Sequence, residues 1–482
     1  MYKKTKIVAT LGPASENLDT MIEMVKNGVN VFRLNFSHGT HEYHEANLKK
    51  IRQIEKELGV RIGILQDISG PKIRTGELKE TFILKSGDVL NFVKEQIVGE
   101  KIGENEFKLC INHPEILSLM KVGELIYLYD GAIRAKVIEK TDEKVVTLVE
   151  NDGMITSRKG VNFPNTRINI DVLTPKDKED MLWGVKNKVD FVAISFVQNE
   201  NDVKKARKFL ESIGSRAKIY SKIEKFDAVE NIDQIIENSD GIMVARGDLG
   251  IEVPFFNVPA IQKEIIKKAN AKSKPVITAT QMMLSMTTKE SATRAEISDV
   301  ANAVLDGTDA VMLSEESAIG HNPVAVVKAM SNTIHEIEKI YPYNKFDDYE
   351  FFDETDMIAS STARLASRLG ASALITITGS GKSAIKMARN RTKIDIFAVT
   401  HDEEAAHSLT IAWGIKPVLV TPKSQTNLII ASAINSLYNS HLIDNKSTYV
   451  MTAGFQTGVE GSTNFIRIIK QDQIDYFRDL SI

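Results

Sequence analysis

The chain contains 482 residues, of which 43% are hydrophobic and 26% are charged, which is typical of a soluble globular protein with roughly three domains. The net charge of -3 at pH 7 excludes a strongly basic surface of the kind that attracts nucleic acid, and no apolar run is long enough to span a membrane. The single cysteine, Cys110, excludes an internal disulfide framework, so we expect a cytoplasmic protein.

Residues 1–12 are basic and then apolar, like the start of a signal peptide. The apolar part is short and stops at Gly12 and Pro13, so we interpret this segment as a first strand.

Short apolar, β-branched runs recur along the chain with helical patterns between them. They cover residues 5–10, 29–34, 61–66, 189–195, 217–223, 241–245, 274–279 and 308–313. Strands that alternate with helices indicate a parallel sheet, and eight such units close into a (β/α)8 barrel.

The regular spacing is interrupted once, by residues 70–168. This stretch holds short alternating segments such as residues 124–129 and 144–149, separated by turn signals such as residues 151–153 (NDG). The pattern predicts an all-β insert. Because it leaves the carboxyl end of a barrel strand, we expect it to lie over the site as a lid.

A second α/β pattern follows the barrel after a linker at residues 341–348. Strand-like runs at 373–378, 395–400, 417–420 and 447–452 indicate a doubly wound domain. We therefore predict a barrel in residues 1–69 and 169–341, a β-barrel lid in residues 70–168, and a C-terminal regulatory domain in residues 342–482.

Charged residues stand where two of the barrel strands end. Lys222 and Glu224 end the fifth run, and Arg246 and Asp248 end the sixth. Two carboxylates beside a lysine and an arginine suit a divalent cation together with a phosphoryl group. Ordinary ion pairs at strand ends are the alternative.

The other strand ends carry further polar groups. These are Arg33, Asn35, Ser37 and His38 after the second run, Asp67, Lys72 and Arg74 after the third, Thr278 and Thr280 at the seventh, and Ser314 and Glu316 at the eighth. Arg33, Arg74 and Lys222 suit phosphate, and phosphoryl transfer needs positioning and charge neutralisation rather than a nucleophile. His41 and His44 share a predicted helical face without a third metal ligand, so we expect them on a solvated surface.

Residues 378–383 (TGSGKS) follow a strand and open a helix. They resemble the end of a phosphate-binding loop, although Thr376 replaces its first glycine. The backbone amides could cradle a phosphate, and a plain turn from strand to helix is the alternative.

Several longer motifs resemble the pyruvate kinase family. They are residues 5–15 (TKIVATLGPAS), 30–39 (NVFRLNFSHG), 70–76 (GPKIRTG), 159–164 (KGVNFP), 221–224 (SKIE), 243–250 (MVARGDLG), 279–282 (ATQM) and 298–307 (SDVANAVLDG). The resemblance covers essentially the whole chain. It implies a TIM barrel with an inserted β lid and a C-terminal doubly wound α/β domain, without an N-terminal extension or an added C-terminal domain. It also implies phosphate transfer from phosphoenolpyruvate to ADP, giving pyruvate and ATP in the last step of glycolysis.

The resemblance also implies roles for individual residues. Lys222 and Arg33 would stabilise the phosphoryl group, and Thr280 would serve proton delivery. The substrate would be bound by Ala245, Arg246, Gly247 and Asp248, and Mg2+ (or Mn2+) by Glu224 and Asp248. The nucleotide would be bound by Asn35, Phe36, Ser37, His38, Arg74 and Lys159. Asn35, Ser37, Asp67 and Ile68 match a monovalent-cation site, and Thr378, Ser380, Gly381, Lys382 and Ser383 match a loop for the phosphate of a small-molecule effector. The family is usually homotetrameric.

Three departures from the family pattern bear on function. Lys72 replaces the glutamate of potassium-dependent members, so we predict that K+ is not required; a solvated Lys72 is the alternative. Asn199 replaces a common lysine, which puts one nucleotide contact in doubt. The loop at residues 454–461 lacks the basic residue expected for a second phosphate, which favours a monophosphorylated effector or none.

Two other functions remain open at this level. A magnesium-dependent lyase or aldolase acting on a pyruvate enolate would need the carboxylates but not Lys222 or Arg74. A non-catalytic phosphosugar sensor would use only the C-terminal domain.

Overall fold

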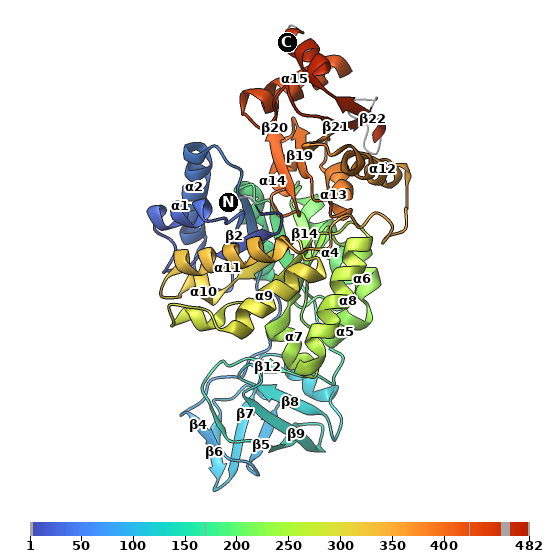
Figure 1. Cartoon of the computed structure of the whole chain (residues 1–482). Coiled ribbons are helices and arrows are strands. Elements are labelled where there is room, and N and C mark those ends of the chain that lie inside the picture. Colours follow the sequence, from blue (N-terminus) through green and yellow to red (C-terminus); the bar gives the residue numbers. More distant parts are fainter. Residues whose placement is uncertain (1–2, 169, 424, 455–462, 481–482) are drawn as a thin grey trace.

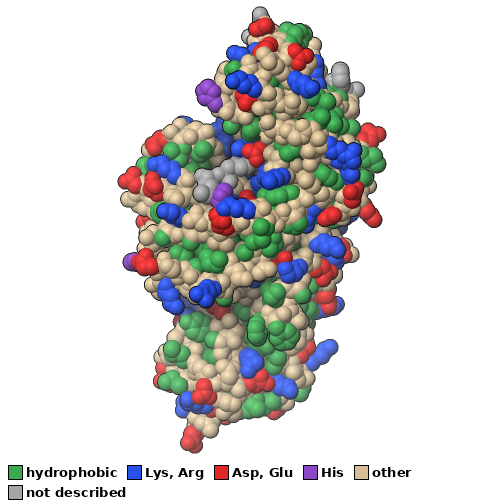
Figure 2. All heavy atoms as spheres, viewed as in Figure 1, with side chains coloured by type: hydrophobic (Ala, Val, Ile, Leu, Met, Phe, Trp, Pro, Cys, Tyr) green, Lys and Arg blue, Asp and Glu red, His purple; other side chains and the backbone are tan. Residues whose placement is uncertain are grey.

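A computed structural model of the chain describes residues 3–168, 170–423, 425–454 and 463–480. Figure 1 shows an elongated molecule with three parts: a β insert at one end, a barrel in the centre and a C-terminal α/β domain at the other end. No helix in these described ranges is long and apolar enough to cross a membrane. On the face seen in Figure 2, acidic and basic side chains are interspersed, in keeping with a net charge near zero.

The eight strands predicted for the barrel are confirmed. They are β1 (Lys6–Thr10), β2 (Val31–Asn35), β3 (Gly63–Asp67), β13 (Phe191–Ile194), β14 (Lys218–Ile223), β15 (Gly241–Ala245), β16 (Val276–Ala279) and β17 (Ala310–Leu313). They close in the order β1-β17-β16-β15-β14-β13-β3-β2, and every pair is parallel. All eight carboxyl ends therefore meet at one rim.

The helices of the barrel follow the strands. They are α1 (Leu18–Lys26), α2 (His41–Leu58), α3 (Pro175–Lys186), α4 (Glu200–Ser212), α5 (Phe226–Glu230), α6 (Ile232–Asn238), α7 (Arg246–Glu252), α8 (Val258–Ala271), α9 (Arg294–Asp306), α10 (Glu315–Ala318) and α11 (Pro323–Glu338), with 3-10 turns η2 (Phe255–Asn257) and η3 (Leu284–Thr287).

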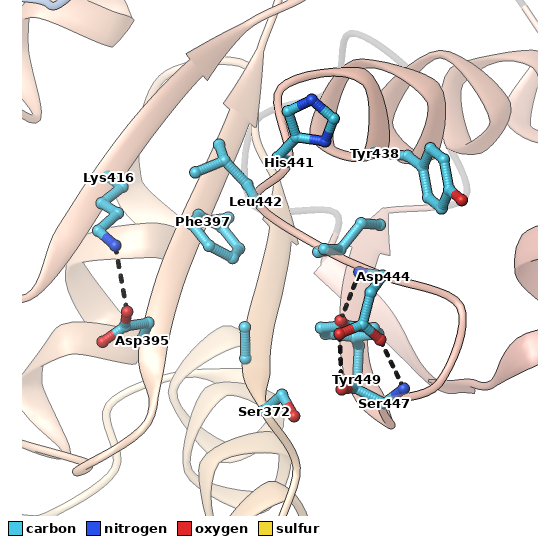
Figure 3. A pocket seen from close by; sticks show the side chains of 12 residues that line it. Ser372, Asp395, Phe397, Lys416, Tyr438, His441, Leu442, Asp444, Ser447 and Tyr449 are labelled. Atoms are coloured by element: carbon cyan, nitrogen blue, oxygen red, sulfur yellow. Dashed lines mark hydrogen bonds and ion pairs between the residues drawn. The ribbon is translucent and has the colours of Figure 1, made fainter.

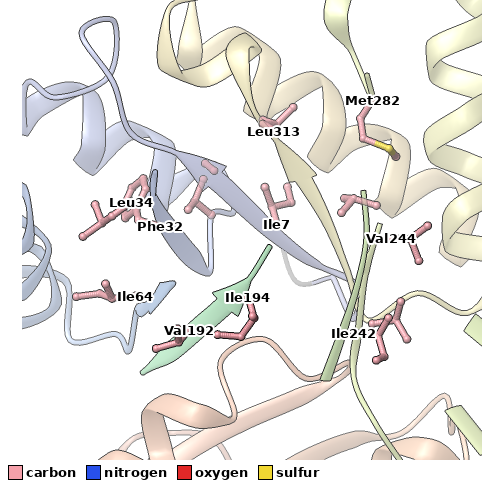
Figure 4. Close-up of a cluster of buried hydrophobic side chains, with 14 of the residues drawn as sticks. Ile7, Phe32, Leu34, Ile64, Val192, Ile194, Ile242, Val244, Met282 and Leu313 are labelled. Carbon is pink, nitrogen blue, oxygen red and sulfur yellow. The ribbon is translucent and has the colours of Figure 1, made fainter. Parts of the chain in front are cut away.

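Each barrel strand is buried on both faces, which explains the continuous apolar runs in the sequence. In β1, Val8 points into the barrel and packs with Met243 and Ile277, whereas Ile7 points outward into the layer shared with the helices, shown in Figure 4. Ile411 of the C-terminal domain joins the inner cluster and so helps to close the end of the barrel opposite the rim.

The insert is entirely built from strands and short turns. Its strands are β4 (Phe82–Leu84), β5 (Val89–Val93), β6 (Glu100–Gly103), β7 (Glu106–Cys110), β8 (Leu125–Leu128), β9 (Ile133–Lys140), β10 (Lys144–Val149), β11 (Gly153–Ile155) and β12 (Val161–Asn162), with one 3-10 turn, η1 (Pro114–Ser118). They form a seven-stranded sheet in the order β12-β8-β9-β10-β5-β7-β6 and a two-stranded sheet, β11-β4. We call this part the lid.

The C-terminal domain is a doubly wound α/β unit. Its elements are α12 (Glu354–Leu369), β18 (Ala373–Ile377), α13 (Lys382–Arg389), β19 (Asp395–Thr400), α14 (Glu403–Ser408), β20 (Ile415–Leu419), α15 (Thr426–Asn439), β21 (Tyr449–Gly454), β22 (Thr463–Ile469) and α16 (Gln471–Asp479). The sheet order is β20-β19-β18-β21-β22. Separate apolar clusters on its two faces contain α15 with α16 and α12 with α13. The antiparallel edge strand β22 was not among the predicted strands.

Buried charges attach this domain to the amino ends of the barrel strands. The Arg391 guanidinium lies 3.0 Å from Asp309 Oδ1 and donates to the Gly307 carbonyl at 2.7 Å. The Lys6 ammonium donates to the Ile415 carbonyl at 2.7 Å. The C-terminal domain therefore lies at the end of the barrel opposite the rim that carries the polar residues.

Candidate active site

Lys222, at the end of β14, is the centre of a cluster of charges at the rim. Its ammonium lies 2.8 Å from Glu224 Oε1 and 3.2 Å from Asp67 Oδ1, and it donates to Ser195 Oγ at 2.8 Å. The side chain is only 12% exposed. The lysine is therefore held by three partners from three neighbouring strand ends.

Arg33 joins this cluster from β2. Its Nε lies 2.7 Å from Asp67 Oδ2 and its Nη1 donates to Thr10 Oγ1 at 3.0 Å. Because β2, β3, β13 and β14 are consecutive in the barrel, their carboxyl ends bring residues far apart in the sequence together. Asp67 thus lies between two cations, with one carboxylate oxygen on each.

The charges in the cluster shift one another's pKa. Burial alone would raise the pKa of Asp67, but Lys222 and Arg33 outweigh burial and lower it. Burial would lower the pKa of Lys222, but Asp67 and Glu224 outweigh it and raise that pKa above its ordinary value. Asp67 and Lys222 are therefore stabilised as ions by each other.

Glu224 has a different environment. Burial raises its pKa, and the nearby charge of Asp248 adds to this effect against the opposing effect of Lys222. Its Oε2 accepts a hydrogen bond from the Phe196 amide at 2.7 Å. A buried and a partly buried carboxylate that repel each other are a suitable donor set for a divalent cation, which would remove the repulsion.

Within the described residues, no group of three or more His, Cys, Asp or Glu side chains forms a complete metal site. Mg2+ commonly binds through one or two carboxylates and completes its shell with water and substrate oxygens. Glu224 and Asp248 fit that pattern.

The turn between β15 and α7 is fixed to the loop after β16. Arg246 donates to the Thr280 carbonyl at 2.7 Å and to Asp299 Oδ1 at 2.7 Å, and the Gly247 amide donates to Thr280 Oγ1 at 2.8 Å. Thr280 has φ of 68°, a left-handed conformation that is strained for a β-branched residue. The Arg246 side chain therefore orients the turn, and Thr280 is held at the rim.

The loop after β2 carries the residues predicted to bind nucleotide. Asn35 Oδ1 accepts from the Ser37 amide at 3.1 Å, and His38 is exposed. Phe36 is 2% exposed and its ring stacks on His44, with 4.2 Å between centroids. Only the backbone of Phe36 is therefore left to contact a nucleotide. The prediction of a solvated His44 was wrong: its side chain is buried because it packs beneath Phe36.

Arg74 and Lys159 lie side by side where the lid joins the barrel. Arg74 forms a β-bridge with Gly160 and its guanidinium donates to the Arg158 carbonyl at 3.0 Å. The Lys159 ammonium lies 4.4 Å from the centroid of the Tyr129 ring. Both side chains are therefore carried by the segments of the lid that lead to and from the barrel.

Two residues that depart from the family pattern, Lys72 and Asn199, have defined partners. The Lys72 ammonium lies 3.8 Å from Asp130 Oδ1 of the lid. At the predicted monovalent-cation site, the Ile68 carbonyl accepts a hydrogen bond from Ser195 Oγ at 2.8 Å. Asn199 is the N-cap of α4 and accepts from the Asn201 amide at 2.9 Å.

The predicted effector loop lies between β18 and α13. The Gly381 amide donates to Thr378 Oγ1 at 3.0 Å, and Gly381 has φ of 86°, which explains the glycine there. A cavity of about 540 Å³ is lined by Thr378, Ser380, Lys382 and Ser383, together with Arg216 from the barrel. Most of the loop at residues 454–461 lies outside the described residues.

A second cavity of about 560 Å³ lies at the opposite end of the C-terminal sheet, shown in Figure 3. Its charged groups have partners: Lys416 lies 3.2 Å from Asp395, and Asp444 Oδ1 accepts from the Ser447 amide at 2.7 Å. This arrangement explains the fold of the loop after α15.

Sequence reasoning missed Ser195 and Thr10 as members of the charged cluster. Both stand at the end of barrel strands, so the rule that found Lys222 could have found them. A serine and a threonine are common in such positions, however, and nothing in the sequence shows that they contact Lys222 and Arg33.

Comparison with known proteins gives a consistent result. The family models described as "Pyruvate kinase, barrel domain" and "Pyruvate kinase, alpha/beta domain" match residues 2–327 and 356–469. A pyruvate kinase of Staphylococcus haemolyticus is 40% identical over 474 residues, which are 97% of this chain and 80% of the relative. One from Clostridium acetobutylicum is 39% identical over 97% of this chain and 99% of the relative.

A solved structure of a pyruvate kinase from Cryptosporidium parvum is similar with a TM-score of 0.90 and 34% identity, over 97% of this chain and 96% of that chain. Because the family models cover both the barrel and the C-terminal domain in order, the similarity is not confined to a common barrel fold. The chain belongs to the pyruvate kinase family and is a phosphotransferase.

Proposed function

We propose that the protein transfers the phosphoryl group of phosphoenolpyruvate to ADP, giving pyruvate and ATP, in the last step of glycolysis. The observation that carries this proposal is the meeting of Lys222 and Arg33 on Asp67, beside Glu224, at one rim. Phosphoryl transfer is catalysed mainly by positioning and charge stabilisation, and this cluster supplies both.

Lys222 and Arg33 would face the phosphoryl group while its bond to the enol oxygen breaks and its bond to an ADP phosphate oxygen forms. Their positive charges are held in place by Asp67, so little reorganisation is needed when negative charge develops. Enolpyruvate then takes up a proton at its methylene carbon, and the hydroxyl of Thr280 would hold the proton donor on that face.

Glu224 and Asp248 would hold Mg2+, or Mn2+ in its place. When bound, the ion would neutralise substrate oxygens as a Lewis acid. The turn at Ala245, Arg246 and Gly247 would orient the substrate carboxylate, because hydrogen bonds from Arg246 and Gly247 to Thr280 fix that turn. Asn35, Phe36 (through its backbone), Ser37, His38, Arg74 and Lys159 would contact the nucleotide as the lid closes.

A lyase or aldolase acting on the same enolate is the other candidate for this rim. It would use the carboxylates but has no use for a phosphate-binding lysine. The three partners of Lys222 favour the kinase, because they keep the ammonium charged and fixed.

A chain of this family can also assemble and respond to effectors. We propose a cytoplasmic homotetramer with the domain division 1–69, 70–168, 169–341 and 342–482. Phe255 and Phe256 are adjacent, 76% and 72% exposed, which supports an interface because paired exposed aromatic rings are unusual on a free surface.

We further propose that the loop of Thr378, Ser380, Gly381, Lys382 and Ser383 binds the phosphate of a monophosphorylated small molecule. In a titration of initial rate, glucose 6-phosphate should lower the KM for phosphoenolpyruvate. Fructose 1,6-bisphosphate at equal concentration should lower this KM no further than glucose 6-phosphate does. Stronger activation by the bisphosphate would contradict the proposal.

Replacing Lys222 by methionine tests the main proposal. The variant should lose about 10²–10³-fold in kcat, because charge stabilisation in the transition state is lost, while phosphoenolpyruvate still binds in the presence of Mg2+. ADP-dependent pyruvate formation is followed with lactate dehydrogenase and NADH. Lys218→Met, at the other end of the same strand, is the control and should keep normal turnover. Pyruvate formation without ADP would favour the lyase instead.

The potassium requirement is tested separately. We expect equal turnover with and without K+ in a sodium-free buffer, because the ammonium of Lys72 would supply the positive charge that K+ provides in potassium-dependent members. Lys72→Glu should restore a K+ requirement. Strict dependence of the unmodified protein on K+ would refute this view.

A further inference from the structure

The end of α7 is joined to the lid by a buried carboxylate that the proposed mechanism does not use. Glu252 is 5% exposed. Its Oε1 accepts a hydrogen bond from Asn162 Nδ2 of β12 at 3.0 Å. Its Oε2 lies 3.6 Å from the Lys225 ammonium and accepts no hydrogen bond from any described residue. One side chain therefore contacts both the lid and the barrel rim.

The neighbours of this contact are the two carboxylates proposed to bind the metal. Asp248 lies four residues before Glu252 on α7, so the two side chains occupy the same helix face. Lys225 directly follows Glu224 at the end of β14. The Glu252–Lys225 pair thus bridges the two separate chain segments that carry Glu224 and Asp248.

The space between these groups is small. Asp248, Glu252, Lys225 and Asn162 all line a small cavity of about 40 Å³ between the lid and the barrel. The Lys225 and Glu252 side chains are 8% and 3% exposed, so solvent hardly screens their interaction.

The lid also approaches α7 at a second point. Gly131, in the turn between β8 and β9, faces Ile251, since a Cβ atom added to this glycine would lie 3.6 Å from the Ile251 side chain. The lid therefore passes close to the last turn of α7, and the hydrogen bond from Asn162 to Glu252 joins the two. Movement of the lid away from the barrel would break this hydrogen bond.

We propose that Glu252 is a positioning residue that links the position of the lid to the placement of Glu224 and Asp248. With Asn162 in place, Glu252 is held between the lid and Lys225, and the first turn of α7 keeps Asp248 facing Glu224. Without Asn162, the carboxylate turns toward Lys225 and the last turn of α7 loses its support. The inference rests on the proposed function only in taking Glu224 and Asp248 as the metal ligands.

A double-mutant cycle of Asn162→Ala and Glu252→Gln tests the coupling. Glu252→Gln keeps the shape of the side chain but removes the charge opposite Lys225. Each single variant should weaken Mn2+ binding about 10-fold, measured by electron paramagnetic resonance of free Mn2+ without nucleotide or substrate. The double variant should be no weaker than the single variants, because both act through one contact.

Kinetics provide the second readout. The concentration of Mg2+ for half-maximal rate and the KM for phosphoenolpyruvate should rise more than kcat falls, since Glu252 touches neither substrate nor metal. The control is Glu230→Gln, which removes an exposed ion pair with Arg167 at 2.8 Å and should leave Mn2+ affinity unchanged.

Three outcomes would overturn the proposal: unchanged Mn2+ affinity in both single variants, multiplied effects in the double variant, or an equal loss in Glu230→Gln. If Glu252→Gln does not fold, as judged by its Tm, Asn162→Ala alone decides by its Mn2+ affinity. If the unmodified protein makes no pyruvate, the proposed function fails, whereas the Mn2+ titration still decides the coupling.

Discussion

The active rim depends on the ability of one buried carboxylate to hold two cations. Lys222 and Arg33 would repel each other across the barrel if Asp67 did not lie between them, with one oxygen on each. Burial makes this arrangement costly unless every charge is paired. Because Asp67 stabilises the ionised form of Lys222, and both cations stabilise the ionised form of Asp67, the positive charges are present and oriented before any substrate arrives. This preorganisation is what phosphoryl transfer requires.

Three parts of the molecule position the residues of that rim: the barrel, the turn before α7 and the lid. The barrel brings four consecutive strand ends together and supplies Asp67, Ser195, Lys222 and Arg33. The turn before α7 is fixed by hydrogen bonds from Arg246 and Gly247 to Thr280, so this strained residue is held at the rim. The lid meets α7 through the hydrogen bond from Asn162 to Glu252, at the helix that also carries Asp248.

Much of the barrel and of its charged rim could be predicted because the sequence patterns that indicate them are local. Strands buried on both faces leave continuous apolar runs, and charges at their carboxyl ends have no structural use in such runs. The edge strand β22 was missed because it pairs antiparallel at the border of the sheet. The burial of His44 depends on Phe36 and Trp183, which approach it only in the folded barrel.

Contacts between segments that are distant in the sequence could not be predicted. The Lys72 ammonium is near Asp130 of the lid, a residue that no spacing rule associates with it. Glu252 follows the motif at residues 243–250 by two residues, but its partners Asn162 and Lys225 come from the lid and from another strand end. Long side chains reach several ångströms from their backbone positions. The order of strands in the sequence therefore predicts at which end of the barrel a side chain lies, but not which neighbouring residue it contacts.

The most direct test of this account is the pKa of Lys222 in the unmodified protein and in Asp67→Asn. It can be measured by competitive acetylation over a range of pH with detection of the modified lysine by mass spectrometry. The account predicts a pKa above the ordinary lysine value in the unmodified protein, because Asp67 and Glu224 outweigh burial, and a clear decrease when Asp67 loses its charge. An ordinary pKa that does not change in Asp67→Asn would show that the buried carboxylate does not hold the cations, and would contradict the account.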